Sequence, residues 1–317
     1  MQLKKYLFHF KEFLIQIFIG NKNHKRKKEL RKIKYWHHYL SENYGYIADK
    51  YKKAEKPITH ANIEYKIWVM WWQGEENMPE IIRINFDSLK RNSNGHEIVL
   101  ITKDNCFDYL KIPNYIIDKV SRNIISLTHL SDYIRVALLS KHGGLWLDAT
   151  VYVNSPLPIE FNLPYWTNKW ELRESEYDSY NLWIGLWGLS SVPKLLITQY
   201  MGIWYSFPNN PLFVCLNDFW LAYWKKENHV PYYWTTELFL IGIMFDKIES
   251  VKEMINNIQF NNPQTFNMRY YMNKKFDKHV WNELLSDTQF FYLSWKEKYL
   301  EIDPETNEKT LFKYLKD

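Results

Sequence analysis

Three charged side chains between positions 131 and 153 have types and spacing that could support chemistry: Asp132, Arg135 and Asp148. Asp132 and Arg135 are one helical turn apart, so they share one face of a predicted helix. Asp148 follows a short apolar strand that comes after a Gly-Gly pair. Open α/β sheets bind ligands at the carboxyl ends of their strands, and we expect this carboxylate at such an edge.

Each of these residues also has an interpretation that needs no ligand. Asp132 and Arg135 could form an ordinary surface ion pair worth well under ~1 kcal/mol. Alternatively, Asp132 accepts hydrogen bonds from ligand hydroxyls while Arg135 binds an anionic group. Asp148 could be a metal ligand, an acceptor for a ribose or sugar hydroxyl, or a turn-forming residue. Spacing alone leaves these alternatives open.

The elements that must position these residues alternate between strands and helices. Residues 67–72 form a continuous apolar run, which is typical of a parallel strand covered on both faces. Further strands are predicted at 97–102 and 123–126, with helices after Pro79 and around 104–110. This alternation predicts a doubly wound α/β sheet with right-handed crossovers.

The next predicted helix has its apolar face between Leu127 and Leu138. Gly143 is placed to end this helix in a left-handed cap. Short strands at 145–147 and 151–153 flank Asp148. This unit therefore carries all three charged residues.

The pattern after Pro158 is less regular. It predicts helices at 195–205, 211–224 and 236–245, and a late strand at 289–295. Lys296 follows the late strand, and the polar tail from Glu297 is expected to be peripheral.

The N-terminal part has the composition of a membrane-surface segment. Residues 3–19 have the apolar spacing of an amphipathic helix, and the run 22–34 contains eight Lys and Arg residues but one acid. An apolar stripe beside clustered basic residues suits an interface with anionic lipid. We therefore expect an extension over residues 1–56 that could anchor one main domain over residues 57–317. The alternative is a helix docked on its own domain, with the basic run solvated.

Composition excludes several classes of protein. The net charge of +5 comes from the basic run, which argues against a general nucleic-acid binder. The two cysteines have no paired spacing, so neither a disulfide framework nor a zinc site is indicated, and a reducing cytoplasm fits. No run approaches 18 apolar residues, so no transmembrane helix is expected.

Several motifs of known chemistry are missing. The first strand is not followed by Gly-x-Gly-x-x-Gly, and no Walker A sequence occurs, which argues against a dinucleotide site or a P-loop. The nucleophile elbow Gly-x-Ser-x-Gly and the zinc motif His-Glu-x-x-His are also missing.

Two motifs resemble the combined signature of glycosyltransferases with a GT-A fold: Ser-Asp-x-x-Arg at 131–135 and Gly-Gly-x-x-x-Asp at 143–148. The chain resembles the capsular polysaccharide synthesis proteins, akin to family-32 glycosyltransferases and the sugar-transferase domains of large clostridial toxins. The run Ile-Trp-Val-Met-Trp-Trp-Gln-Gly at 67–74, followed by Pro79, is similar to their opening segment.

The resemblance covers residues 67–156 and is weaker as far as Lys296. It implies a GT-A-like, doubly wound (Rossmann-like) mixed sheet with an N-terminal helical extension. By position, Asp132 and Arg135 would hold the donor sugar, and Asp148 would be the first acid of an Asp-x-Asp motif. Binding of the nucleotide donor, from base to diphosphate, is assigned to Trp71, Trp72, Gln73, Asp132, Arg135 and Lys296.

The chain departs from that motif at one position. Where Asp-x-Asp has its second acid, usually a ligand of Mn²⁺ or Mg²⁺, this chain has Thr150. Magnesium sites commonly combine one or two carboxylates with substrate phosphates. We therefore expect Mn²⁺ or Mg²⁺ at Asp148 and the diphosphate, unless Arg135 or Lys296 replaces part of the role of the metal.

The resemblance predicts a hexosyltransferase that uses a nucleotide sugar, with a UDP-sugar favoured over a GDP-sugar. The acceptor would be a growing capsular or cell-surface polysaccharide or a lipid-linked glycan, and family-32 relatives favour retention of configuration. The expected location is cytoplasmic, at the inner face of the cell membrane, with contact through residues 3–34.

Two alternatives belong to other classes of protein. A nucleotidyltransferase would make the nucleotide sugar, but such enzymes usually carry a Gly-rich phosphate loop after the first strand, and residues 72–75 are not one. A non-catalytic glycan-binding or scaffold protein would explain Thr150 as a sign of lost chemistry.

Overall fold

The computed structural model describes residues 22–57, 64–169, 199–230 and 235–317. Its centre is a five-stranded sheet in the order β2-β1-β3-β6-β5. β1 is parallel to β2 and β3, whereas β6 is antiparallel to β3 and β5. The predicted mixed α/β sheet is therefore confirmed. The strands are β1 (Ile67–Met70), β2 (Ile98–Ile101), β3 (Gly144–Leu147), β5 (Tyr165–Lys169) and β6 (Gln199–Ser206).

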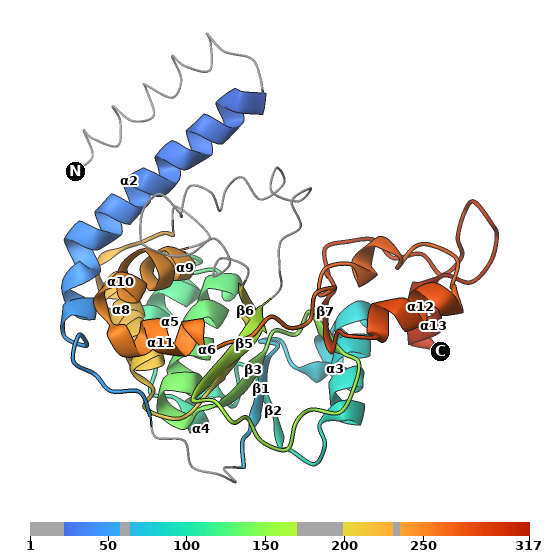
Figure 1. The fold of residues 1–317 in the computed structure, drawn as a ribbon, viewed down its shortest axis with the longest axis horizontal. Coiled ribbons are helices and arrows are strands. Elements are labelled where there is room, and N and C mark those ends of the chain that lie inside the picture. The colour runs from blue at the N-terminus through green and yellow to red at the C-terminus, as the bar shows by residue number, and fades with distance from the viewer. Residues whose placement is uncertain (1–21, 58–63, 170–198, 231–234) are drawn as a thin grey trace.

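Both faces of this sheet are buried (Figure 1). Alternate strand residues point to opposite faces, so Trp68 and Trp146 belong to one core whereas Ile67 and Leu145 belong to the other. The first core is completed by α2 (Lys22–Asp49), α4 (Cys106–Tyr109), α5 (Asn114–Ser121), α6 (Leu127–His142), α8 (Pro211–Lys226), α9 (Thr235–Phe239), α10 (Phe245–Lys247) and α11 (Glu249–Asn256).

The second core lies between the sheet and a smaller layer. α3 packs on this side, next to an antiparallel two-stranded sheet of β4 and β7. The layer consists of α3 (Glu80–Asn92), β4 (Val151–Val153), the short helix η5 (Met268–Tyr270), α12 (Lys278–Leu285), β7 (Phe290–Tyr292) and α13 (Leu311–Lys316).

The helix that carries Asp132 and Arg135 forms as predicted. Ser126 caps α6 by accepting a hydrogen bond from the backbone of His129 at 3.2 Å. The helix ends at Gly143, whose φ of 64° confirms a positive φ, although its ψ of −156° is not that of a left-handed helix. A Cβ on Gly143 would lie 2.6 Å from backbone atoms of Ser206 and Pro208, so only glycine fits there.

The strand predicted at 123–126 is wrong. These residues form the turn between α5 and α6, and Asn123 has a φ of 56°. The backbone N–H groups of Ile124 and Ile125 both bond to Lys119 O, at 2.8 and 3.1 Å, which closes the end of α5. Ile125 of this run is buried in the first core, and the third strand of the sheet comes only at β3.

The helix predicted at 195–205 is also wrong for its described part, because residues 199–206 form β6. This strand pairs with β3 on one edge and with β5 on the other. Its β-branched and aromatic residues suit a central strand. Residues 195–198 lie outside the described part.

Other late elements match their predictions. α8 covers the helix predicted at 211–224, and β7 lies within the strand predicted at 289–295. The helix predicted at 236–245 is α9, which continues through a π-helical turn, η4 (Leu240–Met244), into α10.

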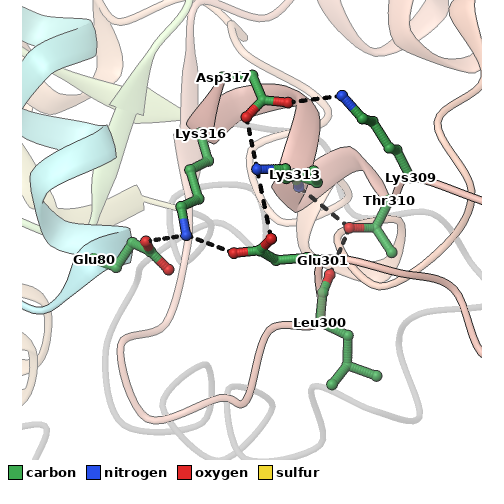
Figure 2. Close-up of polar contacts among 8 residues, drawn as sticks. All are labelled: Glu80, Leu300, Glu301, Lys309, Thr310, Lys313, Lys316 and Asp317. Carbon is green, nitrogen blue, oxygen red and sulfur yellow. Dashed lines mark hydrogen bonds and ion pairs between the residues drawn. The ribbon is translucent and has the colours of Figure 1, made fainter.

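The tail is packed on the protein and is not peripheral as expected. Leu311 and Phe312 of α13 are buried in the second core. Lys316 lies between Glu80 of α3 and Glu301, with Nζ–O distances of 2.6 and 2.5 Å (Figure 2). An ion pair therefore holds the tail against the first residue of α3.

At the other end of the chain, the second half of α2 packs on the main body. Tyr44 donates a hydrogen bond to Glu227 at 2.8 Å, and His37 Nε2 lies 2.7 Å from Gly242 O. The amphipathic helix predicted at 3–19 lies outside the described residues, and the division at residues 56 and 57 stays a prediction. No helix among the described residues is both long and apolar enough to span a membrane.

Candidate functional site

Asp132, Arg135 and Asp148 come together at the carboxyl end of β3. Arg135 Nη2 donates a hydrogen bond to Asp132 Oδ1, and Arg135 Nη1 lies 3.8 Å from Asp148 Oδ1. The side chain of Arg135 is only 9% exposed, against 19% for Asp132 and 25% for Asp148. The ordinary surface ion pair is thereby excluded. Instead, a buried guanidinium links two carboxylates that are only partly exposed.

Two tryptophans that no sequence motif indicated complete this cluster. Trp146 Nε1 donates a hydrogen bond to Asp148 Oδ1 at 2.8 Å. Arg135 Cζ lies 5.8 Å from the ring of Trp146 and 6.0 Å from the ring of Trp204. Trp204 is paired with Trp146 across β3 and β6. Such cation–π contacts hold the guanidinium in place. Trp146 could have been predicted, because residues two apart in a strand share a face.

Asp148 lies in the short connection between the two sheets. Its backbone N–H donates to Gly202 O of β6 at 2.8 Å, and its carbonyl accepts from Val151 N at 2.9 Å. The backbone carbonyl of Thr150, two residues on, accepts a hydrogen bond from Leu293 N, beyond the end of β7, at 2.8 Å. The position of Asp148 therefore depends on both sheets.

The antiparallel pairing of β4 with β7 brings the late segment to this edge, because β7 ends where β4 begins. Trp295 follows and is 49% exposed. Its ring lies edge-on to that of Trp71, with 6.3 Å between centroids. Lys296 is exposed, with Nζ 5.8 Å from the centre of the Trp295 ring. Lys296 thus lies at the rim formed by the ends of β1 and β7.

The segment after β1 reaches the same edge, since β1 and β3 are parallel. Trp71 and Trp72 are both partly buried and pack against opposite cores. Gln73 is exposed, and its carbonyl accepts a hydrogen bond from Asn77 Nδ2 at 2.8 Å. Of these three residues, Trp71 contacts Trp295, while the role of all three in binding a nucleotide stays a prediction.

Charges in the cluster nearly balance. Burial raises the pKa of Asp132 to about 6; Arg135 opposes this shift, and Asp148 adds to it. With both carboxylates ionised, the cluster has one negative charge in excess; with Asp132 protonated, it is neutral. The positive charge of Arg135 is therefore already balanced by the carboxylates of the cluster.

The raised pKa of Asp132 predicts a pH-dependent loss of stability. The pKa of about 6 lies above the ordinary aspartate value of 3.8, so the folded protein holds a proton that the unfolded chain releases. The stabilisation present below ~pH 4 is therefore lost as the pH rises to ~6. Relative to Asp132→Asn, the unfolding free energy of the native protein should fall by up to about 3 kcal/mol over this range. Urea unfolding from pH 4 to 7 measures the difference, and parallel curves would contradict the prediction.

The donor set at Asp148 fits a metal ion that arrives with its phosphates. Within the described residues, no group of three or more His, Cys, Asp or Glu side chains could hold a metal. Asp148 supplies one carboxylate, whose Oδ1 already accepts a hydrogen bond from Trp146. Phosphate oxygens and water would have to provide the remaining ligands, as in many Mg²⁺ sites.

A further tyrosine and arginine lie within electrostatic range of the site. Burial raises the pKa of Tyr292, the Asp148 carboxylate raises it further, and Arg269 lowers it. Arg269 lies on η5, where its guanidinium is 4.9 Å from the ring of Tyr270. No sequence pattern indicates these residues, because their proximity depends on the pairing of β4 with β7.

The fold and site define a mixed α/β protein with a charged cluster at the carboxyl edge of its sheet. The family described as capsular polysaccharide synthesis protein matches residues 16–315, so the chain belongs to this family, as its motifs predicted. Among solved structures, the chain is similar to one titled PaToxG Glycosyltransferase, with 13% identity and a TM-score of 0.37 over 74% of this chain and 83% of that one. The search of curated proteins gave no match.

Proposed function

We propose that this protein is a glycosyltransferase that moves a sugar from a nucleotide donor to a growing polysaccharide or lipid-linked glycan. The observation that carries the proposal is the cluster of Asp132, Arg135 and Asp148 at the carboxyl edge of β3. Such an edge is where open α/β sheets bind ligands. Membership of a capsular polysaccharide family supports a sugar as the group transferred.

The proposed roles follow from exposure and charge. The side chains of Asp132 and Asp148 are partly exposed and would accept hydrogen bonds from hydroxyls of the donor sugar. Arg135 is mostly buried between them, so it would hold the two carboxylates in place. Trp71 and Trp295 offer aromatic surface at the rim, on which a nucleotide base would stack.

Charge on the leaving diphosphate must be stabilised as the bond to the sugar breaks. A Mn²⁺ or Mg²⁺ ion bound at Asp148 would supply that stabilisation. Lys296, exposed at the rim, would add a second cation. We favour a UDP-sugar as donor and retention of configuration, both from the family resemblance; NMR of the anomeric proton in the product would test the latter.

A lipid-linked acceptor would place the enzyme at a membrane surface. Basic residues at the start of α2 support this, because that end of the helix extends away from the main body (Figure 1). Each such residue adds about 1 kcal/mol near anionic lipid. Co-sedimentation with phosphatidylserine vesicles should therefore weaken when Lys25, Lys27 and Lys28 are changed to Glu, and unchanged binding would count against a membrane contact there.

Calorimetry tests the proposed function with the native protein and UDP-glucose, UDP-galactose or GDP-mannose. We expect one nucleotide sugar to bind, and to bind more tightly with Mn²⁺ present. Tighter binding of UTP than of every nucleotide sugar would favour a nucleotidyltransferase. If neither class of ligand binds, a non-catalytic glycan-binding or scaffold role would replace the proposal.

A further inference from the structure

In the described structure, the outer edge of β4 is satisfied by side chains of α3, while its other edge pairs with β7. Ser88 Oγ accepts a hydrogen bond from Val153 N at 2.9 Å, and Asn92 Nδ2 donates to Val153 O at 2.9 Å. Asn85 Nδ2 donates to Ala149 O at 3.2 Å. These three side chains lie at i, i+3 and i+7, on one face of the helix. This face of α3 therefore takes the place of a neighbouring strand.

Asn85 is costly to keep in this position. It is 1% exposed and lies beside apolar residues of the second core such as Ile82 and Phe86. Its Oδ1 is buried and has no hydrogen-bond partner among the described residues. An unpaired buried oxygen costs about 1–3 kcal/mol, which leucine would avoid. The benefit of the amide must therefore come from the Nδ2 donor and its bond to Ala149.

The carbonyl of Ala149 lies one residue beyond Asp148. From these contacts we infer that Asn85 is a positioning residue for Asp148. Its hydrogen bond to Ala149 O ties α3 to the segment that carries the carboxylate, and so fixes where the carboxylate would meet the donor. The inference rests on the proposed glycosyl transfer. Asn92 makes the same kind of bond four residues further along the segment, at Val153, where β4 already pairs with β7. The two asparagines thus share chemistry and element but differ in distance from the site.

This difference gives a matched pair of variants. Asn85→Ala should lower kcat for hydrolysis or transfer of the nucleotide sugar by about 10-fold or more, because small displacements of catalytic groups have large effects. The KM for the donor should change less than about 3-fold, since Asp132 and the aromatic rim remain. Asn92→Ala should keep kcat within about 2-fold of native while losing similar stability. Equal losses of kcat in both variants would reduce Asn85 to a structural role and overturn the inference.

Hydrogen exchange separates this inference from the proposed function, because it needs no substrate. In Asn85→Ala, the amides of Asp148 and Val151 should exchange faster than in Asn92→Ala, measured by NMR or by mass spectrometry of peptides over 146–152. Unchanged exchange there would overturn the inference even if the enzyme is active. A native protein that turns over no nucleotide sugar would instead defeat the proposed function, and the exchange result would stand by itself.

Discussion

Asp148→Asn should lower turnover of the nucleotide sugar at least 100-fold while leaving the fold intact. Asparagine has the same shape, and its side-chain oxygen can still accept the hydrogen bond from Trp146. The substitution removes the negative charge that would bind the metal and its diphosphate. Loss of one preorganised electrostatic group typically costs about 10²- to 10³-fold in kcat. Release of UDP or GDP, measured with and without Mn²⁺, gives the effect.

Asp87→Asn provides the matched control. Asp87 lies on α3 with a side chain that is 46% exposed and 3.7 Å from Lys90. Its removal changes the net charge by the same amount but should leave turnover within about 2-fold, because surface ion pairs contribute little. Full turnover in Asp148→Asn would remove Asp148 from the catalytic site, whatever the behaviour of the control.

Arg135→Met should destabilise the protein by about 3–5 kcal/mol, the usual cost of removing one partner from a buried ion pair. Methionine fills a similar volume between Trp146 and Trp204, so the loss is mainly electrostatic. Asp132 and Asp148 would then face each other without the guanidinium between them. Urea unfolding near pH 7 measures the change in unfolding free energy.

A double-mutant cycle identifies the source of that loss. Adding Asp132→Asn to Arg135→Met removes the carboxylate left without a partner, so the double variant should recover part of the stability. We expect a coupling energy of about 1–3 kcal/mol, as for residues in one network. Strictly additive effects would mean that the guanidinium acts through packing alone.

Local patterns were sufficient to predict the main elements of the site. The apolar face of α6 and the run before Asp148 fixed which residues lie at the carboxyl edge. The same patterns also predicted the segment that ends in Trp71 and Trp72. These predictions succeed because helix and strand periodicity depend on residues within a few positions of one another.

The remaining features depend on contacts between distant segments. β6 was mistaken for a helix because its strand conformation is set by pairing with β3 and β5. The apolar residues at 123–126 were mistaken for a strand because a short apolar run does not distinguish a strand from another buried segment. Nor could the sequence indicate that Asn85 bonds to the backbone beside Asp148, because that contact joins residues 64 positions apart.

The pairing of β4 with β7 also has a consequence for how the protein is made. A ribosome releases Asp148 long before residues 290–292, so the nascent chain carries the carboxylate without the strand that fixes its surroundings. Pairings between such distant segments form slowly. The edge that would bind the donor is therefore among the last parts to mature, and a partly synthesised chain should be inert toward its substrate.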